Sequence, residues 1–217
     1  FAKRQAQKFN VQTYPHKELV IVNQGDTWVV DNPLPGITEV MVRPELTNGA
    51  MHNIGNRLAR GQYVVRWDDD DIIASDRIEK QINAIKETGA PASTFANYVN
   101  VSLIDGTIRE QRAGFCPDLL CHKNEGYQHD ETVKRGSDGL FCMEYYYGQI
   151  AVIKNVPHKY IRILHGINQI WDRKALFPST EPGDIEVSAE TDMDYVHEAV
   201  ELFQRETGFQ RSLKQGN

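Results

Sequence analysis

Four consecutive carboxylates, Asp68 to Asp71, stand directly after residues 63–67. Residues 63–67 are rich in β-branched and aromatic side chains and follow Gly61, which predicts a buried strand. Like charges this close repel by roughly 1 kcal/mol per pair even in water, so folding alone gives no reason for the quartet. In a strand, its first and third members would share one face and its second and fourth the other. Paired oxygen ligands at the carboxyl end of a strand predict a site for a divalent cation and a bound ligand.

Helix capping is the structural alternative for these acids. A helix is expected to begin near Ser75, and Asp71 or Asp76 would suit the positive end of its dipole. One cap accounts for one aspartate, however, and leaves the others unexplained. A metal or nucleotide role is therefore the favoured interpretation of the quartet.

Length and composition are those of a globular protein. The 217 residues fit one α/β domain with a C-terminal addition, and 40% hydrophobic with 25% charged residues is ordinary. A net charge of −6 gives no general attraction to nucleic acid or to an anionic membrane.

Neither a membrane span nor a disulfide framework is expected. No apolar stretch reaches the roughly 20 residues that cross a bilayer, and residues 1–5 lack the apolar core of a signal peptide. The three cysteines, Cys116, Cys121 and Cys142, match no paired zinc spacing and are expected to be reduced and buried. A cytoplasmic protein is the default expectation.

Strand-like and helix-like segments alternate along the chain, which predicts a largely parallel sheet with covered faces. Expected strands occupy residues 18–22, 37–42, 63–67, 93–103, 107–111, 150–153 and 160–164, and expected helices 2–10, 48–60, 75–88, 131–148 and 189–207. Asp105-Gly106 between two strand-like runs predicts a hairpin. Residues 112–130 are expected to form a long loop, and such loops are often functional. The last helix carries an apolar stripe that we assign to core packing, Met193, Val196, Val200 and Phe203.

Five segments in this order resemble the inverting glycosyltransferases of family 2, which have the GT-A fold. They are residues 12–22, residues 48–63, the quartet Asp68–Asp71, residues 130–140 with Ser137-Asp138, and residues 160–168 with Tyr160, Arg162 and His165. The quartet occupies the place of the family's D-x-D-D motif. The last segment is similar to the family's tyrosine-arginine-x-histidine segment, with one extra residue before His165.

This resemblance covers about residues 5–170 and implies the fold. It implies an α/β, GT-A-like three-layer sandwich with a mainly parallel central sheet, a small β-hairpin and a C-terminal helical extension. Residues 1–170 are expected to form the GT-A-like domain and residues 171–217 the extension with one helix. The family's opening strand is expected to precede Phe1.

The resemblance also implies a metal-dependent site. Transfer of a sugar from a nucleoside diphosphate releases a diphosphate, whose developing charge Mg²⁺ or Mn²⁺ stabilises as a Lewis acid. Asp70 is the expected metal ligand. His165 is the expected second ligand, since imidazole suits Mn²⁺ better than Mg²⁺; a structural, hydrogen-bonded histidine is the alternative. Asp68, near the ribose, and Asp69 are expected to bind the nucleotide.

An inverting displacement needs a base to take the proton from the acceptor hydroxyl. Asp138 matches the aspartate of the family's Glu-Asp pair and is the expected base, with a capping or helix-surface carboxylate as the alternative. Ser137 stands where the family usually has glutamate, which removes a neighbouring negative charge. The placement of the acceptor is therefore expected to differ from the family's.

Asn23 and Gln24 follow the first expected strand, where the family usually has acids that face the nucleotide base. An amide carbonyl can still accept a hydrogen bond from a uracil N–H, so both are expected in the nucleotide site, with turn residues as the alternative. The loop pair His122-Lys123 is a candidate contact for the diphosphate or the acceptor.

These residues predict a metal-dependent, inverting glycosyltransferase that uses a nucleotide-sugar, with a UDP-sugar favoured. One alternative is a sugar-phosphate nucleotidyltransferase, which usually carries a glycine-rich, basic loop after its first strand. Another is a non-catalytic sugar- or nucleotide-binding module of the same fold. The acceptor stays open among glycan, protein, lipid-linked sugar and modified nucleobase.

Overall fold

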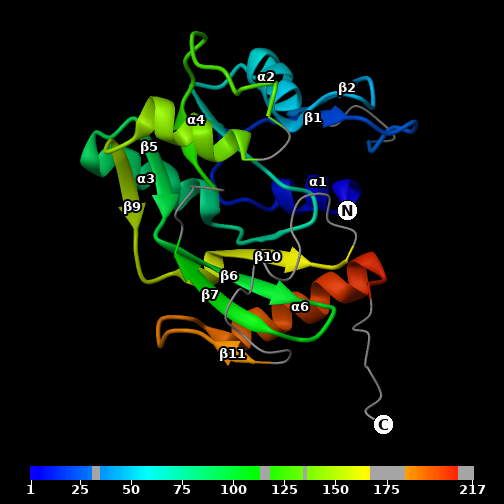
Figure 1. Ribbon diagram of the computed structural model, residues 1–217, viewed down its shortest axis with the longest axis vertical. Helices are drawn as coiled ribbons and strands as arrows, with labels where there is room; N and C mark the ends of the chain where they lie inside the picture. The colour runs from blue at the N-terminus through cyan, green and yellow to red at the C-terminus, as the bar shows by residue number, and fades with distance from the viewer. Residues whose placement is uncertain (31–34, 113–117, 134–135, 167–183, 210–217) are drawn as a thin grey trace.

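The computed structural model describes residues 1–30, 35–112, 118–133, 136–166 and 184–209, which form an α/β fold (Figure 1). Its strands make three sheets. The first is β1 (Leu19–Asn23) beside β2 (Ile37–Met41). The second has the order β3 (Tyr63–Val65), β8 (Leu120–His122), β5 (Ala92–Phe95), β9 (Ile150–Ile153). The third has the order β11 (Ile185–Glu186), β7 (Ile108–Arg112), β6 (Asn97–Ser102), β10 (Tyr160–Leu164), β4 (Ile72–Ile73).

The described sheets are less uniformly parallel than the sequence indicated. The pairs β1–β2, β5–β9, β6–β10 and β7–β11 are parallel, whereas β3–β8, β5–β8, β6–β7 and β4–β10 are antiparallel. One antiparallel pair is the expected hairpin, in which Gly106 takes a positive φ of 78° in the turn. The other antiparallel pairs come from β4 and β8, which lie where no strand was expected.

Helices cover these sheets, and a side chain caps the start of two of the described helices, α2 and α6. They are α1 (Ala2–Asn10), α2 (Asn48–Leu58), α3 (Arg77–Thr88), α4 (Ser137–Tyr146), the short 3₁₀ helix η1 (Pro157–Lys159) and α6 (Met193–Thr207). Thr47 caps α2 by accepting from Ala50 N, and Asp192 caps α6 by accepting from Tyr195 N. The last helix therefore begins at Met193, four residues later than expected.

A large part of the core lies between the third sheet and α6. Val99, Ile161, Val196 and Phe203 are each 0% exposed in one apolar cluster. The stripe expected on the last helix thus packs as predicted, with Met193 and Val200 at its margin. The expected domain boundary at residue 170 lies outside the described residues.

β1 and β3 leave two facing edges open. Within the described residues β1 pairs with β2 and β3 with β8, and no ladder joins β1 to β3. Their starts are tied together all the same, because the Glu18 carboxylate accepts hydrogen bonds from the backbone N–H groups of Arg60 and Gly61, at 2.5 and 2.8 Å. Both strands are only half-buried, although burial on both faces was expected. An open ladder edge is where a further strand can pair.

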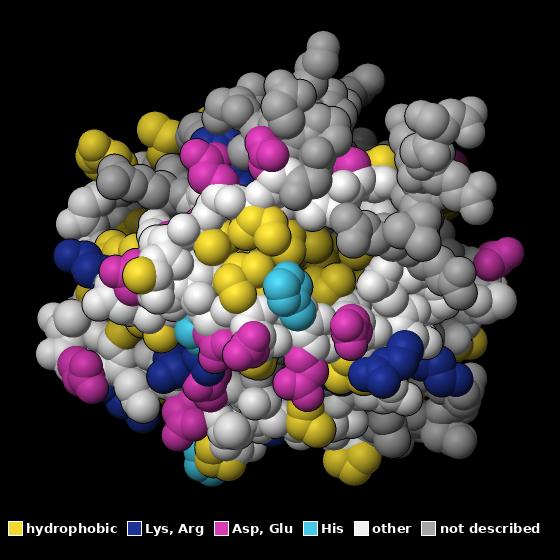
Figure 2. Space-filling view, turned by 90° about the horizontal axis from the view of Figure 1, so that it is seen from below, with side chains coloured by type: hydrophobic (Ala, Val, Ile, Leu, Met, Phe, Trp, Pro, Cys, Tyr) yellow, Lys and Arg dark blue, Asp and Glu magenta, His cyan; other side chains and the backbone are white. Residues whose placement is uncertain are grey.

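The surface agrees with a chain of modest negative charge. Figure 2, a view from below Figure 1, shows hydrophobic side chains gathered near the middle of the face, with charged side chains of both signs around them. None of the described helices has both the length and the apolar composition that crossing a bilayer requires. Cys121 and Cys142 are buried, as expected, and Cys116 lies outside the described residues.

Candidate active site

One cavity of about 1000 Å³ brings the predicted site residues together. It opens between β1 and β3 and extends to the turn that follows β3. The seven side chains expected to bind the metal or the nucleotide or to act as the base all line it: Asn23, Gln24, Asp68, Asp69, Asp70, Asp138 and His165. Residues up to 142 positions apart in the chain, from Asn23 to His165, thus face one space, although their individual roles stay predictions.

The four aspartates lie in a turn and not on a strand, so the expected alternation of faces is wrong. β3 ends at Val65, and each aspartate then finds its own environment. Asp71 is buried; its carboxylate accepts from the Tyr160 hydroxyl at 2.7 Å and from Ile163 N at 3.1 Å. Burial raises the pKa of Asp71 to about 7, and the charges of Asp70 and Asp68 add to the rise. Asp71 therefore anchors the turn to β10, and it does not cap α3, whose N-terminus has no side-chain cap.

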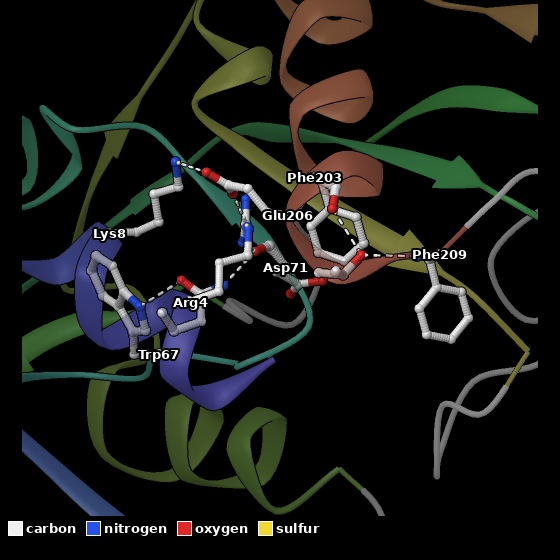
Figure 3. Close-up of polar contacts among 9 residues, drawn as sticks. Arg4, Lys8, Trp67, Asp71, Phe203, Glu206 and Phe209 are labelled. Atoms are coloured by element: carbon white, nitrogen blue, oxygen red, sulfur yellow. Dashed lines mark hydrogen bonds and ion pairs between the residues drawn. The ribbon is translucent and has the colours of Figure 1, made fainter. Parts of the chain in front are cut away.

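Helix α1 contacts this turn directly, and α6 in turn contacts α1 (Figure 3). The side chains of Arg4 and Gln5, on α1, both donate hydrogen bonds to the backbone carbonyl of Asp71. Glu206, near the end of α6, accepts from Arg4 Nε at 2.7 Å and from Lys8 Nζ at 2.8 Å (Figure 3). Since α1 and α6 lie at opposite ends of the chain, the acidic turn is fixed by contacts that no local sequence pattern reports.

Asp70 and His165 meet at the end of the cavity. Asp70 Oδ2 lies 3.2 Å from His165 Nε2, and the His165 ring stacks on Phe1 with centroids 4.8 Å apart. Adjacent ligands of one Mg²⁺- or Mn²⁺-sized ion lie about 3 Å apart, so the two side chains fit two positions of such a site. Within the described residues no three His, Cys, Asp and Glu side chains gather as a metal-binding group. A cation held here would take its other ligands from water and from a bound diphosphate.

Arg66 joins the acidic turn to the expected base. Its Nε donates to Asp68 Oδ1 at 2.6 Å, and its Nη1 donates to Asp138 Oδ2. Burial raises the pKa of Asp68, but the charge and hydrogen bond of Arg66 outweigh it and hold the pKa below its usual range. Asp138, in the first turn of α4, therefore faces the same cavity as Asp68, and Arg66 lies between them.

Two histidines beside this pair were missed by sequence reasoning. His52 on α2 lines the cavity, and its ring lies 4.6 Å from that of His129, centroid to centroid. Burial lowers the pKa of His52 to about 3, with a further contribution from the charge of Arg66, so its imidazole is neutral at pH 7. Helical spacing was the available signal, because the cavity-facing residues of α2 recur every three to four positions, Asn48, Met51, His52, Gly55 and Asn56.

At the end of β1 the two amides that line the cavity differ. Asn23 donates to Thr27 O and Glu39 Oε1, and its own carbonyl accepts from Gly25 N. Gln24 uses its amide nitrogen on backbone carbonyls, the shortest bond being 2.9 Å to Leu46 O. Both amide N–H groups of Asn23 are thus used in its turn and its carbonyl accepts one hydrogen bond, which makes the carbonyl of Gln24 the better acceptor for a ligand.

The candidate pair His122-Lys123 lies elsewhere. β8 runs antiparallel to β3 and pairs His122 with Tyr63, at the start of β3 and away from the aspartates that follow its end. Lys123 Nζ donates to the carbonyl of Ala59 at 2.6 Å. Neither residue is among those that line the cavity, so a diphosphate or acceptor contact of this pair gains no support and stays a prediction.

With this geometry in place, comparison with known families decides the class. The model for glycosyl transferase family 2 matches residues 3–148, more than half of the chain. The chain belongs to glycosyltransferase family 2. The matched residues of this family 2 chain include the acidic turn, Arg66 and Asp138, whereas His165 lies beyond them.

Relatives of this family 2 chain agree with that assignment. An uncharacterized glycosyltransferase of Haemophilus influenzae is 30% identical over 105 residues, which are 45% of this chain and 42% of that protein. The crystal structure of S. aureus TarS 1–349 in complex with UDP-GlcNAc superposes with a TM-score of 0.59 at 16% identity, covering 95% of this chain and 62% of that one. The complex of TarS 1–349 with UDP gives a TM-score of 0.58 at 15% identity, covering 76% and 58%. The chain thus spans less than two thirds of each relative, and the likeness to TarS confirms the GT-A-like fold.

Gly49 in α2 packs closely against the backbone of the loop that precedes α4. A Cβ on Gly49 would lie 2.3 Å from the carbonyl oxygen of Asp130, in the loop that carries His129. Gly49→Ala must therefore displace backbone, and we expect it to lower the free energy of unfolding by about 1–3 kcal/mol in urea titrations.

Gly55→Ala is the matched control in the same helix. Its Cβ would meet the nearest atom, Val22 Cγ2, at an ordinary 3.5 Å. Replacing a helical glycine without a clash should raise the free energy of unfolding by about 0.5–1 kcal/mol. Equal effects of the two substitutions would show that the loop yields freely at Gly49.

Proposed function

We propose that this family 2 protein transfers a sugar, with inversion, from a nucleotide-sugar to an acceptor hydroxyl, that it depends on a divalent cation, and that the donor is a UDP-sugar. The observation that carries the proposal is the cavity, in which an acidic turn, a His–Asp pair and a separate carboxylate on α4 face one space. The crystal structures of the similar protein TarS in complex with UDP and with UDP-GlcNAc support the choice of uridine nucleotide.

Each part of the donor has a counterpart in the wall of the cavity. The carbonyl of Gln24 can accept from a uracil N–H at the end of β1. Asp68 can accept hydrogen bonds from ribose hydroxyls, since Arg66 keeps it ionised. Asp70 and His165 would hold a divalent cation, which when bound supplies positive charge to the diphosphate as it leaves. The nucleotide thus lies along the edge where β1 and β3 end.

Transfer with inversion places the base opposite the leaving group. The bond between the sugar's anomeric carbon and the diphosphate oxygen breaks as the acceptor oxygen forms its bond to the same carbon. The acceptor's proton passes to a carboxylate oxygen of Asp138, which stands apart from Asp70 and His165. His52 and His129 line the wall beside Asp138; burial lowers the pKa of both, so both are neutral neighbours.

Ligand-induced stabilisation tests the proposal directly. A ligand that binds only the native state stabilises it by mass action and so raises its melting temperature. At a ligand concentration of 100 times Kd, the free energy of unfolding rises by about 2.7 kcal/mol. We expect UDP and UDP-sugars with Mn²⁺ to raise it, GDP-mannose to raise it less, and EDTA to cancel the effect. Slow release of UDP from a UDP-sugar with Mn²⁺ would support transfer, whereas binding without turnover would favour the non-catalytic alternative.

A further inference from the structure

Arg66 is placed to do more than pair two acids. Arg66, Asp68 and Asp138 have side chains only 23%, 21% and 22% exposed, so their mutual contacts are shielded from water. Burial lowers the pKa of Arg66, but the charges of Asp68 and Asp138 outweigh this and raise it above the ordinary value. Arg66 is therefore a permanent cation shared by two carboxylates. Within the described residues its third nitrogen, Nη2, makes no hydrogen bond and remains available.

A diphosphate entering this cavity meets an acidic wall. The described carboxylates that line the cavity are Glu18, Asp68, Asp69, Asp70, Asp71 and Asp138, and its guanidinium groups are Arg66 and Arg162. Arg162 donates to the Tyr98 hydroxyl at 3.3 Å, and the charge of Asp71 acts on it as well. Lys17 Nζ donates to the carbonyls of Gln12 and Tyr14. Arg66 is thus the guanidinium that borders both the nucleotide side and the base side of the site.

We propose that Arg66 is a positioning residue that moves from Asp138 to the diphosphate of the donor, and so releases Asp138 to receive the acceptor hydroxyl. This inference rests on the function proposed above. A guanidinium binds phosphate and carboxylate oxygens with the same forked geometry, so the exchange replaces one charge-assisted hydrogen bond with another. While Arg66 donates to Asp138 Oδ2, it occupies one acceptor position of that oxygen and the space from which the acceptor hydroxyl would approach it. Donor binding therefore precedes release of the base.

If the exchange occurs, removing the charge of Asp138 should tighten nucleotide binding. Calorimetry with UDP and Mn²⁺ measures this affinity. In Asp138→Asn the carboxylate that competes with the diphosphate for Arg66 becomes neutral. UDP should then bind about 2- to 5-fold more tightly, the range expected for a partly shielded ion pair. Arg66→Met should weaken UDP binding about 10- to 100-fold, as for loss of a hydrogen bond to a charged group. Arg57→Met, an exposed change on α2, is the matched control and should leave affinity unchanged.

A double-mutant cycle separates exchange from simple structural support. In the Arg66→Met background, Asp138→Asn should no longer tighten UDP binding, because the shared cation is gone. Arg66→Lys keeps the charge without the fork and should restore part of the affinity. This variant also keeps a cation between the two aspartates if Arg66→Met is unstable.

The outcomes distinguish this inference from the proposed function. UDP affinity that is unchanged or weaker in Asp138→Asn, with native protein that binds UDP, overturns the exchange and leaves the proposed function standing. Native protein that binds no UDP with Mn²⁺ overturns both. Tighter binding in Asp138→Asn that persists without Arg66 overturns the exchange as well, because general relief of acidic repulsion would then explain it.

Discussion

Asp138→Asn should slow sugar transfer by about 10²- to 10⁴-fold, the usual contribution of a general base. Asparagine preserves the shape of the side chain and can still lie against Arg66, but its amide cannot take the acceptor's proton near neutral pH. Donor affinity should stay within a few-fold of native, so the loss falls on kcat and not on the donor KM. Steady-state kinetics with a UDP-sugar and Mn²⁺ measure both quantities.

Asp130→Asn is the control for this change of charge. Asp130 is exposed, and its carboxylate accepts from the backbone N–H and the hydroxyl of Thr132 in the loop before α4. It should transfer sugar at close to the native rate. A native rate in Asp138→Asn would identify another group as the base, and an equal loss in both variants would point to damage of the loop.

Some elements of the fold were predicted from the sequence to the residue, whereas α4 and α6 begin later than expected. α1 and β9 have the bounds that the pattern predicts, and the hairpin turn falls at Asp105-Gly106. β4 and β8 were missed because strands of two and three residues carry no periodicity of their own. They exist because neighbours pair with them, β10 with β4 and both β3 and β5 with β8. Such short strands are set by tertiary contacts, which local propensity does not encode.

The sequence predicted which residues line the cavity, but not which of them contact one another. Carboxylates at strand ends, and a histidine in a matching segment, identified residues that share one cavity. The different environments of the aspartates could not be predicted from the sequence. They depend on the hydrogen bonds that Tyr160 donates to Asp71 and that Arg66 donates to Asp68. Asp138 is 72 residues from Arg66, and only the packing of α4 shows that they touch. Asp71, which the sequence did not set apart from the other three aspartates, is buried and hydrogen-bonds to β10.

Asp70→Asn should weaken UDP binding in the presence of Mn²⁺ by more than about 100-fold. Loss of a residue that only hydrogen-bonds a metal ligand already costs roughly 10- to 100-fold in metal affinity, and Asp70 is proposed to bind the metal itself. An amide is a poorer ligand than a carboxylate for a hard cation. The fold should persist, because one charge fewer in the crowded turn relieves repulsion of roughly 1 kcal/mol per close pair. The measurement is the ratio of UDP affinities with Mn²⁺ and with EDTA, which isolates the metal's share from every other effect.

His165→Ala should reduce the same ratio less, because a neutral imidazole contributes no charge to the ion. Its ring also packs between Phe1 and Phe209, with centroids 4.8 and 5.1 Å away, so its melting temperature should fall as well. Asp194→Asn, an equal change of charge at an exposed position in the first turn of α6, should leave the ratio at its native value. If Asp70→Asn also keeps the native ratio, Asp70 does not hold the metal. The Asp70–His165 contact is then an ordinary hydrogen bond that fastens the acidic turn to the segment after β10.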